Sequence, residues 1–182
     1  MKKSKKLIAA AVAAVALFIG SSVKAQTTTS TTAASSPWRL GIGLEAGAPT
    51  GNAHTISNFE LGGTARLQYT ITDKFAWTLT SGYYNMFGKE VPGTAGNAKY
   101  QSLGIIPVKV GAKVFFAPSI YFGAEAGAGF ETHGGTDTKL ILSPGLGWAS
   151  KSVDVGVRYE NFSGQSNNYG LVGLRIAYGF GL

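Results

Sequence analysis

Hydrophobic and polar residues alternate one by one over most of the chain after residue 37. The clearest example is the stretch WRLGIGLEAG, which starts at Trp38. Successive side chains of a β-strand point to opposite faces, so its apolar residues would share one face and its Arg, Glu and most of its Gly residues the other. No segment beyond Trp38 has apolar residues at helical spacing. The pattern therefore predicts an all-β domain.

Eight segments alternate in this way and predict eight strands. They cover residues 38–47, 59–70, 75–84, about 100–115, 120–130, 139–149, 153–160 and 169–180. In the fourth segment the alternation loses its phase at Ile105-Ile106-Pro107. We expect a β-bulge at Pro107, because proline has no backbone N–H to give to a strand ladder.

The connections between the predicted strands alternate strictly between long and short. Four long connections, polar and rich in Gly and Asn, span residues 48–58, 85–99, 131–138 and 161–168, and three tight turns span 71–74, 116–119 and 150–152. Transmembrane β-barrels of bacteria show this asymmetry, with short turns on the periplasmic side and longer loops outside. The even number of strands then places both chain termini in the periplasm.

Two kinds of barrel could use such strands, and they differ in which face is inside. A soluble ligand-binding barrel of the lipocalin kind would turn its apolar face inward and would need a polar exterior. Here the glycines concentrate on the polar face, which suits the narrow interior of an eight-stranded barrel. A whole face of large apolar side chains in water would cost about 1.5–3 kcal/mol for each side chain. An open sheet edge in lipid is also excluded, because its backbone N–H and C=O groups would have no hydrogen-bond partners. The predicted fold class is therefore an all-β, eight-stranded, antiparallel, up-and-down transmembrane β-barrel.

The predicted inner face carries nearly balanced charge. It holds six basic and five acidic residues: Arg39, Arg66, Lys109, Lys113, Arg158 and Arg175, with Glu45, Glu60, Glu125, Asp154 and Glu160. Lys139, at a strand end, is the one charged strand residue that we do not place on this face. An unpaired buried charge is strongly disfavoured, so we expect these side chains to pair into a network that plugs the barrel. The alternative is a narrow, porin-like channel whose charges select ions or small solutes.

Aromatic residues gather near the strand ends of the predicted outer face. Those expected at the turn end are Trp38, Tyr69, Phe75, Trp77, Phe115, Phe122, Trp148, Tyr178 and Phe180, and those expected at the loop end are Phe59, Tyr83, Phe130 and Tyr159. Two such belts are typical of a barrel whose rims lie at the two membrane interfaces.

The N-terminal segment accounts for most of the net charge of +7. Residues 1–25 have a basic start, an apolar stretch too short to span a bilayer and a small-residue end, which together predict a secretory signal peptide. Removing its 5 lysines leaves 11 basic against 9 acidic residues, so nucleic acid is not an expected partner. Residues 26–37 are rich in Ser and Thr and predict a disordered leader, with the barrel at 38–182. The absence of cysteine excludes disulfides, thiolate metal sites and a lipobox anchor.

These residues resemble a known family. The alternating strands with the final run V-x-L-x-I-x-Y-x-F, from Val172 to Phe180, are similar to the OmpA/OmpX type of small outer-membrane barrel. The stretches GIIPVKVGAKVFF and YFGAEAGAGF resemble β-barrel-domain proteins common in Bacteroidota. The resemblance implies location in the outer membrane and a role in envelope integrity, adhesion or surface interaction. The terminal run also resembles the signal by which the barrel-assembly machinery recognises its clients.

An enzyme is the least favoured alternative. The segment VRYENFSG, which ends at Gly164, is similar to the region of outer-membrane lipid A deacylases that carries a Ser nucleophile and a His base. Ser163 matches the nucleophile, but Asn161 stands at the base position and cannot accept the proton. The only histidines, His54 and His133, lie in predicted loops, and they would form a metal site with Asp137 only by chance. We therefore predict no catalytic activity, no cofactor and no metal.

The sequence thus predicts a small outer-membrane barrel that acts structurally or through its surface loops. Its expected partners are outer-membrane lipid and lipopolysaccharide, the barrel-assembly machinery during biogenesis, and an extracellular partner for the loops.

Overall fold

The strands of the computed structural model follow the predicted order. The structure describes residues 36–91, 98–164 and 168–182, so the predicted signal peptide and nearly all of the predicted leader lie outside the described residues. The elements are β1 (Trp38–Gly51), α2 (Asn52–Ile56), β2 (Ser57–Thr72), β3 (Phe75–Gly88), β4 (Leu103–Phe115), β5 (Ile120–His133), β6 (Thr138–Ala149), β7 (Val153–Ser163) and β8 (Tyr169–Gly181).

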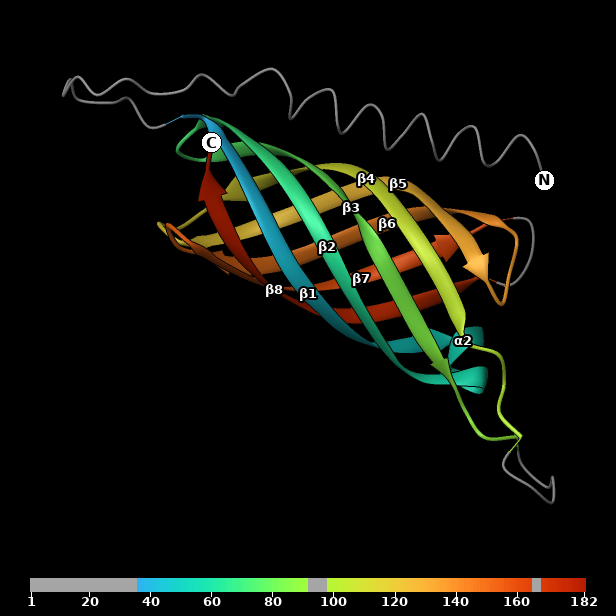
Figure 1. The fold of residues 1–182 in the computed structure, drawn as a ribbon. Coiled ribbons are helices and arrows are strands. Elements are labelled where there is room, and N and C mark those ends of the chain that lie inside the picture. The colour runs from blue at the N-terminus through green and yellow to red at the C-terminus, as the bar shows by residue number, and fades with distance from the viewer. Residues whose placement is uncertain (1–35, 92–97, 165–167) are drawn as a thin grey trace. The chain divides into compact units, whose positions relative to one another are not determined.

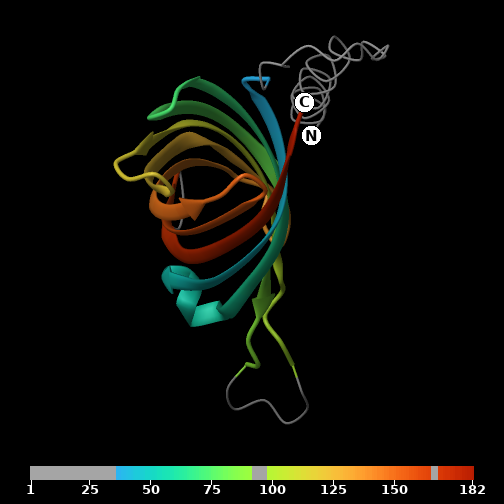
Figure 2. The same ribbon diagram turned by 90° about the vertical axis from the view of Figure 1, so that its left-hand side faces the viewer.

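Each strand pairs with its sequence neighbours, and β1 also pairs with β8, which closes the barrel. All eight pairings are antiparallel. Blue β1 and red β8 lie side by side in both views (Figures 1 and 2). The predicted eight-stranded, antiparallel, up-and-down barrel is confirmed. The strands begin and end at two rims, which we call the turn end, where β1 starts and β8 stops, and the loop end.

The strands continue further toward the loop end than the alternation indicates. Pro49 and Thr50, expected in a loop, pair with Leu171 and Gly170 of β8. Pairing there is carried by backbone hydrogen bonds and needs no alternation of apolar residues. The short helix α2, which the sequence did not predict, occupies residues 52–56 of the first predicted loop. It starts after Gly51, whose φ of 63° lies in the left-handed region that favours glycine.

The predicted bulge at Pro107 is wrong. Pro107 pairs with Gly129 in a continuous register with β5, and the register shift in this pair of strands lies between Gly104 and Ile105. Ile105, Pro107 and Lys109 are all buried, so the alternation is unbroken and Ile105 points inward. The error arose because an isoleucine was expected to face outward like the valines that follow it.

The barrel has its apolar residues outside and its charges inside, the reverse of a water-soluble protein. Leu44, Val110 and Ile176 are 70%, 62% and 53% exposed, while Lys109 and Glu160 are fully buried. Soluble monomers rarely expose an apolar surface that encircles the whole molecule. Within the described residues, no helix is long and apolar enough to cross a membrane.

Most of the predicted aromatic residues lie on the outer face near the rims. At the turn end Tyr69 pairs with both Trp38 and Trp77, and the rings of Trp38 and Tyr69 lie 4.6 Å apart. At the loop end Phe59 stacks on Phe87 at 6.3 Å. The other residues of the turn-end set on this face are Phe75, Phe122, Trp148, Tyr178 and Phe180, of which Phe122, Trp148, Tyr178 and Phe180 are exposed.

Phe115 is the exception to the predicted belt. Its ring lies 5.4 Å from that of buried Tyr121. Phe115 lies two residues after the buried Lys113 on β4, so the two side chains point to the same face of the sheet. Phe115 therefore packs on the inner side at the turn end. Its assignment to the outer belt is therefore wrong, because β4 presents every second residue to the interior up to its last position.

Candidate functional site

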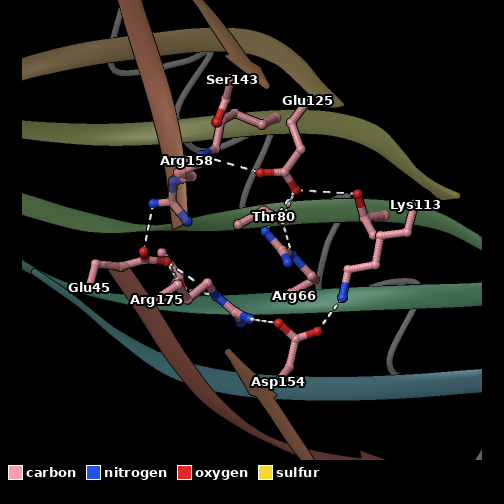
Figure 3. A network of polar contacts seen from close by, with 12 residues as sticks. Glu45, Arg66, Thr80, Lys113, Glu125, Ser143, Asp154, Arg158 and Arg175 are labelled. Carbon is pink, nitrogen blue, oxygen red and sulfur yellow. Dashed lines mark hydrogen bonds and ion pairs between the residues drawn. The ribbon is translucent and has the colours of Figure 1, made fainter. Parts of the chain in front are cut away.

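The interior of the barrel holds one connected chain of ion pairs, built from inward positions of β1, β2, β4, β5, β7 and β8 (Figure 3). Nine of the eleven predicted charges belong to it. In order of contact they are Lys113, Asp154, Arg175, Glu45, Arg158, Glu160, Lys109, Glu125 and Arg66. We call this chain the lumen network.

The part of the network nearest the turn end centres on Asp154. Its carboxylate is bound by the Lys113 ammonium group and accepts a hydrogen bond of 2.8 Å from the hydroxyl of Tyr121. The Lys113 ammonium also lies over the Tyr121 ring, 4.2 Å from its centre. Arg175 links this part to the next, because its Nη1 lies 3.7 Å from Asp154 Oδ1 and its Nε lies 3.2 Å from Glu45 Oε1.

Arg158 joins the two halves of the network. Its Nη2 lies 2.6 Å from Glu45 Oε2, and its Nε lies 2.8 Å from Glu160 Oε1. The same Nη2 donates to the hydroxyl of Tyr84 at 2.8 Å, and the Lys109 ammonium donates to that hydroxyl at 3.1 Å. Arg158 is 8% exposed, so these ion pairs are shielded from water. Its guanidinium, with donors fixed in one plane, is suited to bridging two carboxylates.

Glu125 of β5 links Lys109 to Arg66, the last residue of the network. Its carboxylate lies 3.0 Å from Arg66 Nη2 and 3.4 Å from the Lys109 ammonium, and it accepts hydrogen bonds from Thr80 at 2.7 Å and Thr78 at 3.2 Å. Thr64 supports Glu45 in the same way at 2.6 Å. Buried charges are tolerated when they are both paired and hydrogen-bonded, and these hydroxyl groups supply the hydrogen bonds.

The inner surface is lined with glycine where the strands come closest. A side chain at Gly111 would overlap the carbonyl oxygen of Ala124 on the neighbouring strand, and one at Gly147 would overlap the ring of Tyr121. These positions therefore need glycine to leave room for the strongly curved wall and for the aromatic ring.

Two of the predicted charges lie outside the network. Arg39 is partly exposed at the turn end and donates from Nη1 to the carbonyl oxygen of Ser150 at 2.9 Å. Glu60 is 1% exposed and forms no ion pair with any residue that the structure describes. Lys139, set apart from the inner face in the sequence analysis, is in fact buried and lies 3.1 Å from Asp137. That expectation is wrong, because Lys139 shares the inward phase of Ile141 in β6.

An apolar cluster fills the interior toward the loop end, and the sequence analysis missed it. Its buried members, which we call the apolar cap, are Ala53, Tyr84, Met86, Ile105, Ile141, Phe162, Tyr169 and Leu171. The rings of Phe162 and Tyr169 stack at 4.9 Å. The signal was present in the sequence, since Ile105 and Ile141 keep the phase of the inward residues Lys109 and Ser143. The interior therefore has a charged layer toward the turn end and a mainly apolar layer toward the loop end, which also contains the buried side chains of Glu60 and Lys139.

Little space remains between these side chains. Two cavities are lined by residues of the network, and the centres of water molecules can occupy about 30 Å³ in one and about 10 Å³ in the other. One water molecule needs roughly 10–15 Å³ measured in this way. The cavities therefore have room for only a few water molecules and not for an organic ligand, whose pocket would measure about 300 Å³ or more.

The residues weighed for catalysis do not gather around a carboxylate. Asn161 and Ser163 occupy outward positions of β7, opposite Leu142 and Leu140 of β6. His54 lies in α2 and His133 at the end of β5. In the part of the chain that the structure describes, no three His, Asp or Glu side chains come together as a metal site would require.

Comparison with solved structures identifies other barrels of this kind. A crystal structure of Ail, the attachment invasion locus protein of Yersinia pestis, superposes with a TM-score of 0.54 at 13% identity, over 80% of this chain and 99% of Ail. Ail in complex with the heparin analogue sucrose octasulfate gives 0.55 at 15% identity, over 79% and 97%. The backbone structure of Ail in a phospholipid nanodisc gives 0.51 at 14% identity, over 77% and 99%. No family model and no curated protein matches the sequence. The chain has the fold of a small outer-membrane β-barrel.

Proposed function

We propose that this protein is an integral outer-membrane barrel that does not conduct and acts as a structural element of the membrane. The observation that carries the proposal is the filled interior: the apolar cap packs its loop end, and two cavities lined by residues of the lumen network hold about 30 and 10 Å³. A hydrated ion would have to displace buried ion pairs to pass. The alternative of a narrow, porin-like channel has no comparable support.

The outer face supports a location in lipid. A ring of exposed Leu, Ile, Val and aromatic side chains surrounds the barrel, and each large one would gain about 1.5–3 kcal/mol on transfer from water to an apolar medium. The closed sheet leaves no strand edge without hydrogen-bond partners in the hydrocarbon. By the usual orientation of such barrels, the turn end with both ends of the barrel domain faces the periplasm.

Conductance in a planar bilayer tests the proposal. The mature chain is inserted at known density, and its folded state is checked by the shift in gel mobility on boiling. We expect no steady channel openings. A double variant that empties part of the cap, Met86→Ala with Phe162→Ala, is the matched comparison, since it widens the loop end while leaving the charges in place. Steady openings of the unaltered protein would overturn the proposal in favour of a pore.

A second candidate function is contact with a partner through the loop end. It is favoured by the hairpin that extends β3 and β4 beyond the barrel (Figure 1), where Glu90 bridges to Lys99 and the Val91 N–H donates to the Ala98 carbonyl at 2.8 Å. Ail, which shares this fold, was solved with a heparin analogue bound. Cells that display the protein should then adhere to heparin-coated surfaces. Replacement of residues 90–99 by a tight turn should reduce adhesion to background without changing the amount of folded barrel, and unchanged adhesion would dismiss this candidate.

A further inference from the structure

A small cavity at the turn end of the barrel is lined by an excess of positive charge. It holds about 10 Å³ of space for a water-sized occupant, and the charged groups that line it are the guanidinium groups of Arg39, Arg66 and Arg175 and the carboxylate of Asp154. Asp154 is already bound by Lys113, Arg175 and the Tyr121 hydroxyl. Arg175 also pairs with Glu45, and Arg66 pairs with Glu125. The lumen network and Arg39 together hold six cations and four carboxylates, so positive charge remains in excess inside a wall of low dielectric.

Two guanidinium nitrogens near this cavity have no hydrogen-bond partner. The Nη2 atoms of Arg39 and Arg175 are both buried, and neither donates to any residue in the described part of the chain. Arg175 as a whole is 2% exposed. Buried N–H donors are nearly always satisfied, so these two donors point to an occupant that accepts hydrogen bonds.

The backbone of the cavity wall is shaped to bring the two groups together. Gly41 of β1 and Gly179 of β8 are register partners. A side chain at Gly179 would overlap the Arg39 guanidinium, and a Cβ at Gly41 would lie 3.7 Å from Nη2 of Arg175. Glycine at position 179 makes room for the Arg39 guanidinium itself, and glycine at position 41 leaves the space beside the Arg175 guanidinium open.

We propose that this cavity binds a single small inorganic anion, of the size of chloride, between Arg39 and Arg175. A water molecule could accept the two hydrogen bonds, but it would leave the excess positive charge uncompensated. The cavity is too small for phosphate or a carboxylate ligand. Arg39 lies partly exposed at the turn end, so an anion can enter there without opening the lumen network. The site goes beyond the structural function proposed above, which does not depend on it.

Bromide, which scatters X-rays anomalously, can replace chloride and tests the proposal directly. Crystals of the full mature chain are grown or soaked in sodium bromide. We expect an anomalous peak within hydrogen-bond distance of the Arg39 and Arg175 guanidinium groups. Density for water alone at saturating bromide, or bromide only at other surface positions, would overturn the proposal.

Two variants and one control make the test specific. Gly41→Ala places a methyl group in the cavity with contacts of 3.7–3.8 Å, which the wall can accommodate, and should abolish the bromide peak. Arg39→Gln removes one of the two donor groups and should abolish it as well. Gly173→Ala is the matched control, because it adds the same methyl group on β8, where only the Ala46 carbonyl oxygen lies within 4 Å, at 3.9 Å. It should keep the peak. A bromide peak that persists unchanged in Gly41→Ala and Arg39→Gln would contradict the assigned site.

Discussion

Removal of Arg158 should destabilise the barrel more than removal of any exposed charge. In Arg158→Gln, Glu45 loses a cation at 2.6 Å and Glu160 loses one at 2.8 Å. Breaking a buried ion pair by deleting one partner costs about 3–5 kcal/mol. Glu45 still pairs with Arg175, and Glu160 still pairs with Lys109. We therefore expect a loss of stability at the lower end of this range, about 3 kcal/mol. With a urea dependence of about 1–3 kcal/mol per M, the midpoint should fall by about 1–3 M.

The assay is equilibrium unfolding by urea in lipid vesicles, followed by tryptophan fluorescence. Lys151→Gln, in the turn between β6 and β7, is the control, since Lys151 is exposed, and it should change stability by no more than about 0.5 kcal/mol. The double variant Glu45→Gln with Arg158→Gln should lose at least about 1 kcal/mol less than the sum of the two single losses, because the residues are in contact. A loss below about 1 kcal/mol in Arg158→Gln, or strict additivity in the double variant, would refute the coupling inferred for the network.

Four further substitutions test other parts of the account in the same unfolding assay. Leu44→Arg places a charge on the outer face and should cost about 2–4 kcal/mol in lipid, whereas Phe116→Arg, in the turn after β4, should cost about 0–1 kcal/mol; equal losses would contradict the lipid-facing belt. Phe162→Ala empties a fully buried position of the apolar cap and should cost about 3–5 kcal/mol, and a loss under about 1 kcal/mol would show that the cap is not packed. Tyr121→Phe removes the hydroxyl that binds Asp154 and should cost about 1.5 kcal/mol, while no measurable loss would mean that Lys113 and Arg175 suffice for Asp154.

The strands and their inward faces could be predicted because alternation is a local property of the sequence. Glu45, Arg66 and Glu125 could be placed on the inner face from their phase alone. Their partners could not be predicted, because contacts across the interior depend on the tilt and stagger of strands far apart in the chain. Arg158 contacts Glu45 on β1, for example, although β7 and β1 are not neighbours in the sheet.

The apolar cap was missed for a different reason. The alternation predicts apolar residues on the outer face, so it loses its phase at Ile105. Ile141 falls on the polar face as an isolated apolar residue beside Ser143, and Phe162 lies in the predicted loop 161–168. Above the charged layer the interior is closed by apolar packing, so hydrophobicity alone no longer distinguishes the faces there. Phase counted back from Lys109 places Ile105 on the inner face as well, on the same face as Ile141.

The most direct test of the central claim is the environment of alternate positions on one strand. The chain has no cysteine, so single cysteines at Val172, Leu174 and Ile176 of β8, and at Gly173 and Ala177 between them, can carry spin labels in lipid vesicles. The account predicts that relaxation by oxygen, which concentrates in lipid, is high at the first three positions and low at the other two. High access of a water-soluble nickel complex at Leu174 and Ile176, with oxygen access showing no period of two, would contradict it.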